Sequence, residues 1–211
     1  MDLGEHLRRN RVSHLRPELP ICRTAIDNSL RIGRWLAENS FPAGTILLKG
    51  PSLQRYYPDT WVRQTGDVDI FISRMPEAIE YAESLVRNGG RLSRTWWLMP
   101  ADFHVGASEY VTGDGIAIDI HVGAYPICTL TYLRADLAEI SNGPYLPPEW
   151  DLTILLCHAL SHRRVLLRDL VDYHFLTQVG RPDESILKSN GLLEVNEFIR
   201  SLRPKAILDE L

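Results

Sequence analysis

Residues 66–72 read Gly-Asp-Val-Asp-Ile-Phe-Ile, a run in which polar and apolar side chains alternate. Because side chains on a β-strand point alternately to opposite faces, Asp67 and Asp69 project to one side while Val68 and Ile70 face a core. Two neighbouring carboxylates in a buried strand resist joint ionisation unless a cation lies between them. The run therefore predicts a strand with a divalent metal site, although a solvated strand end would show the same Asp-x-Asp pattern.

A second alternating strand supplies a third carboxylate. The run 115–122, Gly-Ile-Ala-Ile-Asp-Ile-His-Val, places apolar residues on one face and Asp119 and His121 on the other. Three carboxylates on adjacent strands can hold two Mg²⁺ ions about 3.5 to 4 Å apart, with Mn²⁺ as an alternative metal. The competing interpretation is that Asp119 pairs with an arginine at the sheet edge. We take Asp67, Asp69 and Asp119 as the predicted catalytic and metal-binding residues.

A strand that opens into a helix through glycine lies upstream, at residues 47–53, Leu-Leu-Lys-Gly-Pro-Ser-Leu. Amides exposed after Gly50 can receive a triphosphate, and the Ser52 hydroxyl can donate an additional hydrogen bond. Lys49 can neutralise phosphate as a point charge, with a core-edge lysine as the structural alternative. Such turns occur in many folds, so this motif gains weight only beside the carboxylates.

Together these motifs resemble the nucleotidyltransferases of the DNA polymerase beta superfamily, and most closely the bacterial "uncharacterised nucleotidyltransferase" family. The residues that carry the resemblance are 47–50, 56–58, Arg63, 66–70, 119–121 and the helical segment 152–176. The resemblance implies an α/β (α+β) polymerase beta-like core with a mixed sheet. It also implies Mg²⁺-dependent transfer of a nucleoside monophosphate from a nucleoside triphosphate to an acceptor.

Further residues are candidates for substrate binding. Arg63 is expected at the mouth of the site, close to Gly66, where its guanidinium can clamp phosphate; an ordinary surface arginine is the alternative. His158 and His162 lie four residues apart on a predicted helix, a geometry that permits metal binding but more often serves packing. By the resemblance this helix borders the cleft, so either histidine, like His121, can instead contact the base or the acceptor.

The helical part of the sequence carries a charged segment, Arg168, Asp169 and Asp172, whose spacing favours an ion-paired helix face over an acceptor site. Near Tyr145 the sequence pattern changes from alternating helices and strands to helices alone. This change divides the chain into a nucleotidyltransferase core with an N-terminal helix, 1–144, and a helical lobe, 145–211. The predicted helices are about 21–39, 77–88, 149–161, 165–178 and 192–202. The predicted strands are about 45–48, 68–73, 91–97, 103–110 and 115–122.

The composition limits the partners. With a net charge of -4 over 211 residues, the chain does not favour binding along an extended nucleic acid. We therefore expect a small-molecule or peptide acceptor, without excluding tRNA or a protein side chain. No apolar run is long enough for a membrane span and no signal peptide is visible, which predicts a cytoplasmic protein.

A rival hypothesis is a noncatalytic nucleotide-binding or regulatory protein on the same fold. A missing carboxylate would favour it, and Asp67, Asp69 and Asp119 are all present. The enzyme hypothesis predicts that Asp69→Asn abolishes transfer and leaves the fold intact.

Overall fold

The computed structural model describes residues 20–59, 61–98, 105–128 and 131–206. Within these residues a five-stranded mixed sheet has the order β1-β2-β5-β4-β3, in which β2 and β5 are parallel and the other neighbours are antiparallel. The strands are β1 (Ile46–Leu48), β2 (Val68–Ile72), β3 (Arg91–Leu98), β4 (Val105–Val111) and β5 (Ala117–Val122). The predicted α/β class and mixed sheet are confirmed; residues 103–104 of one predicted strand lie outside the described part of the chain.

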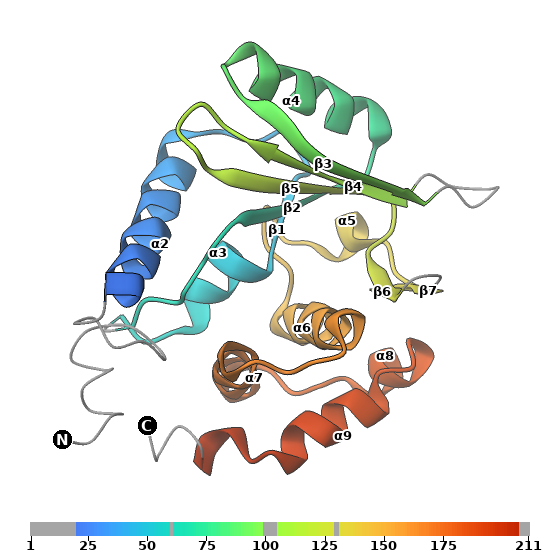
Figure 1. Cartoon of the computed structure of the whole chain (residues 1–211). Helices are drawn as coiled ribbons and strands as arrows, with labels where there is room; N and C mark the ends of the chain where they lie inside the picture. Colours follow the sequence, from blue (N-terminus) through green and yellow to red (C-terminus); the bar gives the residue numbers. More distant parts are fainter. Residues whose placement is uncertain (1–19, 60, 99–104, 129–130, 207–211) are drawn as a thin grey trace.

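One face of the sheet is covered by α2 (Pro20–Glu38) and α4 (Met75–Arg87), as Figure 1 shows. The alternating apolar residues of β2 and β5 point to this face and form one buried cluster with side chains from both helices. Its strand members include Val68, Ile70, Ile72, Ile118 and Ile120, and its helix members include Ile32, Trp35, Tyr81 and Leu85. The polar residues of both strands must therefore point to the opposite face.

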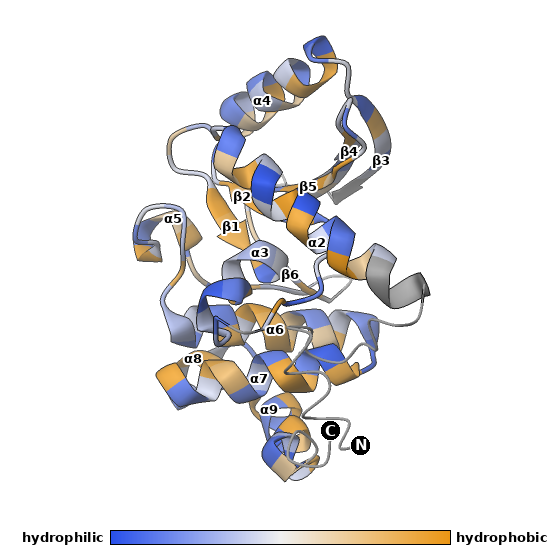
Figure 2. Cartoon of the chain, turned by 90° about the vertical axis from the view of Figure 1, so that its left-hand side faces the viewer, coloured by the Kyte–Doolittle hydropathy of each residue, from blue (hydrophilic) through white to orange (hydrophobic). Residues whose placement is uncertain are grey.

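The opposite face packs against the helical half of the chain, formed by α6 (Pro148–His162), α7 (Leu167–Val179), α8 (Glu184–Ser189) and α9 (Leu193–Ser201). Figure 2 shows both apolar and polar residues along helix α6, whose residues 151–157 are all buried. The core on this side joins Leu48 and Phe71 of the sheet to Leu155 of α6 and Tyr173 of α7. Because this core includes residues from both sides of Tyr145, the division into 1–144 and 145–211 stays a prediction.

Several short elements were not predicted, because hydrophobic periodicity needs a longer window than they provide. They are β6 (Pro126–Cys128), β7 (Thr131–Tyr132), α5 (Leu137–Ile140) and α8. The short helix α3 (Lys49–Leu53) follows β1 directly, and a 3-10 turn, η1 (Gln54–Tyr56), continues it. Among the described helices, none combines the length and the apolar character needed to cross a bilayer.

Candidate active site

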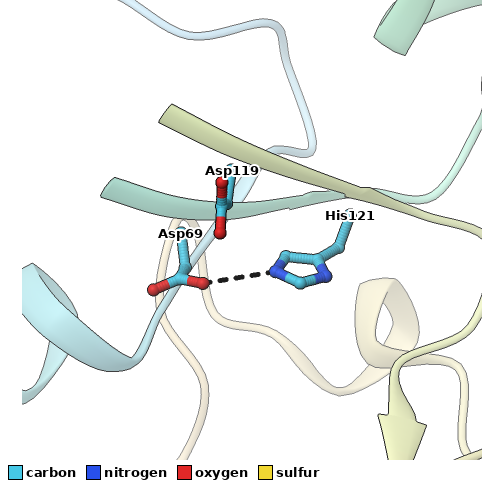
Figure 3. Close-up of side chains that lie close together, drawn as sticks. All are labelled: Asp69, Asp119 and His121. Carbon is cyan, nitrogen blue, oxygen red and sulfur yellow. Dashed lines mark hydrogen bonds and ion pairs between the residues drawn. The ribbon is translucent and has the colours of Figure 1, made fainter. Parts of the chain in front are cut away.

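Two carboxylates and an imidazole converge from adjacent strands. In the parallel pairing of β2 with β5, Asp69 lies opposite Asp119, and Phe71 lies opposite His121. Figure 3 shows Asp119 pointing toward Asp69, whose Oδ1 is 3.2 Å from Nε2 of His121. One ligand atom from each of these three residues lies within 4.8 Å of the others. The register of the sheet therefore builds a compact set of possible metal ligands.

Lys49 is bound to the same carboxylate. Its Nζ lies 2.6 Å from Oδ1 of Asp69, and its backbone has a φ of 45°, a left-handed conformation at the junction of β1 and α3. Burial disfavours the ammonium, but the charge of Asp69 and the contact with it, together with nearby Tyr125 and Asp67, outweigh burial and raise the pKa of Lys49. Burial likewise opposes ionisation of Asp69, but Lys49 and His121 hold the pKa of Asp69 below its usual value. Asp69 is therefore ionised, and its contacts with Lys49 and His121 both use Oδ1, which leaves Oδ2 for another ligand.

Neither Asp67 nor Asp119 forms an ion pair with a residue that the structure describes. Burial first, and the charge of Asp69 second, raise the pKa of Asp67 and raise the pKa of Asp119 to about 6. Within the described part of the chain, Oδ1 of Asp119 is buried without a hydrogen-bond partner. Asp67 precedes β2 and is not in the group whose ligand atoms lie within 4.8 Å; His121 takes that place. The three residues that lie closest together are therefore Asp69, Asp119 and His121, and not the three aspartates expected from the sequence; Asp67 lies beside this group.

A cavity of about 150 Å³ opens beside Asp67 and Asp69, between the sheet and helices α6 and α7. Its lining consists of Lys49, Gly50, Arg63, Gly66, Asp67, Asp69, Leu155, His158, Arg168 and Asp169. A larger depression of about 990 Å³ lies between α2 and α4, over the other face of the sheet, and includes none of these residues. Charged groups of both signs line both cavities, but only the smaller of the two includes Asp67 and Asp69, so it is the candidate substrate site.

The sequence match identifies the family. A family model described as "Uncharacterised nucleotidyltransferase" matches residues 23–193, which is more than half of the chain. The chain belongs to this family. None of the curated proteins matches it.

Two solved structures resemble this member of the uncharacterised nucleotidyltransferase family. JHP933 from Helicobacter pylori is 18% identical with a TM-score of 0.42, and the match covers 74% of this chain and 66% of that one. An antigenic nucleotidyltransferase-like protein from Paracoccidioides brasiliensis is 13% identical with a TM-score of 0.40, over 88% and 92% of the two chains. The chain therefore spans about two thirds of JHP933. Because both TM-scores are low, family membership depends on the sequence match alone.

In this family member Arg63 is a buried ion-pair partner and not an exposed residue at the mouth of the site. Its Nε and Nη2 donate to the two carboxylate oxygens of Asp172 at 2.7 and 2.6 Å, and it is 4% exposed. The Tyr57 hydroxyl donates to the same carboxylate at 2.5 Å. The Arg63–Asp172 pair therefore connects the loop before β2 to helix α7. Asp172 is ion-paired, with Arg63 as its partner.

In this nucleotidyltransferase-family chain the glycine turn packs closely against the entry to β2, and Gly50, but not Ser52, lines the cavity. Ser52 is fully buried, and its hydroxyl donates to Asp151 of α6 at 3.4 Å, so the structure does not bring it into the cavity. A Cβ on Gly50 would lie 3.0 Å from Cγ2 of Thr65 and 3.3 Å from the carbonyl oxygen of Asp67. Glycine is thus required for close packing of α3 against the entry to β2. Gly66 lines the cavity, and a Cβ there would meet nothing within 4 Å.

Ser52→Ala tests this structural role. We expect the free energy of unfolding to fall by about 1 kcal/mol, because the variant removes a buried hydrogen bond to a carboxyl group. Nucleotide binding should stay unchanged, since Ser52 lies outside the cavity. Urea unfolding and calorimetric titration with nucleoside triphosphate measure the two quantities. A variant of wild-type stability with weakened triphosphate binding would restore Ser52 to the substrate site.

The two histidines of α6 lie side by side, as their four-residue spacing predicts, with ring centroids 4.3 Å apart and ring planes tilted by 58°. His158 lines the cavity, and burial, followed by the charge of Lys49, lowers the pKa of His158 to about 3. Its imidazole is therefore neutral near pH 7. His162 lies at the exposed end of α6, and neither histidine is in the three-residue ligand group found among the described residues.

Sequence reasoning missed the residues that hold the entry to β2 from the other side. Asn28 of α2 donates to the carbonyl oxygen of Thr65 at 3.1 Å, and the backbone N–H of Thr65 donates to Oγ of Ser29 at 2.9 Å. Ser29 is a polar residue within the buried face of an amphipathic helix, which was the available signal. Its partner lies 36 residues away, so no local pattern connects the two.

Proposed function

We propose that this protein is a metal-dependent nucleotidyltransferase that moves a nucleoside monophosphate from a nucleoside triphosphate to a hydroxyl or phosphate of an acceptor. The supporting observation is the in-register placement of Asp69 and Asp119 on parallel neighbours, with a buried Asp119 oxygen that lacks a partner. A carboxylate oxygen in that state requires either a proton or a cation. Family membership supports the reaction class.

The residues of the site fit a divalent cation. Asp67, Asp69 and Asp119 carry three negative charges when ionised, and Lys49 neutralises one of them. Oxygen ligands of this kind suit Mg²⁺ and Mn²⁺. Asp69 and Asp119 would hold the ion, Asp67 would contribute to a second one at the mouth of the cavity, and His121 would orient Asp69. When bound, the metal neutralises the reacting phosphate and lowers the pKa of the attacking hydroxyl.

The remaining chemistry belongs to the chain. The acceptor oxygen attacks the α-phosphorus, the bond from that phosphorus to the bridging oxygen of the β-phosphate breaks, and pyrophosphate leaves with the bonding electrons. Asp119 is the proposed general base that receives the proton of the acceptor hydroxyl. Lys49 keeps Asp69 ionised and in place. His158, which is neutral, offers one hydrogen bond from the wall formed by α6.

The proposed acceptor is a small molecule or a peptide. A net charge of -4 is opposed to the many phosphate-neutralising contacts that an extended nucleic acid requires. A tRNA end contributes few such contacts and therefore belongs among the acceptors to be tested.

Two measurements test the proposal. ATP, GTP, CTP and UTP are each added with Mg²⁺ or with EDTA, and the melting temperature is recorded; at least one triphosphate should stabilise the protein only with Mg²⁺. Pyrophosphate release is then measured with that triphosphate and with small-molecule, peptide and tRNA acceptors. Mg²⁺-dependent stabilisation without release under any acceptor would favour a noncatalytic nucleotide-binding protein, and no stabilisation by any triphosphate would refute the proposed function.

A further inference from the structure

Arg168, in the first turn of α7, forms no ion pair within the part of the chain that the structure describes, although its charge lowers the pKa of Asp67 and of Asp169. It lines the cavity beside Asp67 and Asp69, and its Nε is buried without a hydrogen bond. Its guanidinium makes no ion pair with any residue that the structure describes. Arg168 as a whole is half-buried, so it is the Nε atom that has lost its water and gained no partner, and such a donor is destabilising.

The carboxylates next to Arg168 in the sequence are engaged elsewhere. Asp169 accepts a hydrogen bond from the backbone N–H of Leu166 at 2.8 Å and so caps its own helix. Asp172, one turn further on, accepts hydrogen bonds from Nε and Nη2 of Arg63. The ion-paired helix face predicted for Arg168, Asp169 and Asp172 therefore does not form among these three residues; Asp172 instead pairs with Arg63, from the loop before β2.

The other cationic side chains that line the cavity are already neutralised. Lys49 is paired with Asp69 at 2.6 Å, and Arg63 is paired with Asp172 at 2.6 Å. The expected phosphate turn does not compensate, because Ser52 is turned to Asp151 and α3 has only five residues. Among these groups, Arg168 alone has a guanidinium available for an anion.

We propose that Arg168 binds the terminal phosphates of the nucleoside triphosphate and the pyrophosphate that leaves; this assignment rests on the proposed function. A guanidinium is planar and donates two parallel hydrogen bonds to phosphate oxygens. The cavity of about 150 Å³ is smaller than the roughly 300 to 1,000 Å³ that enclose a drug-sized ligand. It therefore receives the phosphate end of the nucleotide, with α7 and not the glycine turn supplying the phosphate contact.

The test uses inorganic pyrophosphate as the probe, with the full chain and an excess of Mg²⁺, in isothermal titration calorimetry. Arg168→Gln should weaken pyrophosphate binding by about 10- to 100-fold, as expected for loss of charge-assisted hydrogen bonds. Arg168→Lys should recover only part of it, because an ammonium lacks the planar fork. The matched control is Arg164→Gln, at an exposed arginine in the loop between α6 and α7, which should change the dissociation constant by less than about two-fold.

The melting temperature of Arg168→Gln should be at least as high as that of the wild type, since the variant breaks no contact with a described residue and removes a buried donor that lacks a hydrogen bond. Unchanged pyrophosphate binding in Arg168→Gln, an equal loss in Arg164→Gln, or no binding by the wild type would each overturn the assignment. The result also separates the two proposals. If pyrophosphate binding depends on Arg168 but no triphosphate releases pyrophosphate, the anion site stands and the transferase activity is refuted. If Arg168→Gln still releases pyrophosphate with an unchanged Michaelis constant, the transferase activity stands and the role of Arg168 is refuted.

Discussion

Replacing Asp119 by asparagine is expected to lower the rate of nucleotidyl transfer by at least about 100-fold while leaving the fold at least as stable as in the wild type. The variant removes one of the two in-register carboxylates and, with it, the proposed base. The folded state of the variant gains stability, because the wild-type Asp119 carboxylate is buried next to the ionised Asp69 and its Oδ1 has no hydrogen-bond partner among the described residues. Pyrophosphate release and urea unfolding in EDTA measure the two effects.

The pH dependence of stability gives an independent readout of the same carboxylate. Burial and the charge of Asp69 raise the pKa of Asp119 from 3.8 to about 6, so the metal-free folded protein holds this proton more tightly than the unfolded chain does. The stability contributed by the proton is therefore complete below about pH 4 and is lost as the pH rises through about 6. Without metal, the difference in unfolding free energy between Asp119→Asn and the wild type should grow across that interval and then level off.

Asp59→Asn, in an exposed turn, is the matched control and should change neither quantity. Asp69→Asn is a less selective test than the sequence suggests, because it would leave the buried ammonium of Lys49 without its counter-ion. Full activity in Asp119→Asn would remove this carboxylate from the reaction. A stability difference independent of pH would mean that its environment is not the one described.

Breaking the Arg63–Asp172 pair is expected to lower the free energy of unfolding by about 3 to 5 kcal/mol, because either single replacement leaves an uncompensated buried charge. Arg63 is 5% exposed and Asp172 0% exposed at the side chain, and two hydrogen bonds join them. Arg63→Met and Asp172→Asn should both show the loss in urea unfolding. The double variant Arg63→Met, Asp172→Leu should be less destabilised than the sum of the single ones, since neither charge then remains.

The control is Arg87→Met, which breaks an exposed pair with Glu83 whose side chains are 63% and 64% exposed, and which should cost less than about 0.5 kcal/mol. If Arg63 instead bound phosphate, as expected from the sequence, its replacement would weaken triphosphate binding and leave the free energy of unfolding unchanged. If Arg63→Met kept wild-type stability but lost affinity for triphosphate, Arg63 would return to the substrate site and the buried pair would not be a structural link between the β2 entry and α7.

Local patterns in the sequence determined the sheet and the identity of the central carboxylates. Alternation of polar and apolar residues over 67–70 and 118–121 separated the apolar face, which packs under α2 and α4, from the face that carries Asp69, Asp119 and His121. The longer helices were also predictable, because each repeats its apolar residues over several turns. The family followed from the same motifs.

Only the tertiary structure decided which polar groups contact one another. Strand register placed Asp69 opposite Asp119. The packing of α6 and α7 against the sheet brought Asp172 into contact with Arg63, and Asp151 into contact with Ser52, over separations of 109 and 99 residues. A sequence window shows that an arginine and an aspartate are present but not which partners burial brings within 3 Å. Pairing between distant residues depends on the desolvation and geometry of the whole core, and this is why Arg63 proved to be engaged and Arg168 free among the residues described.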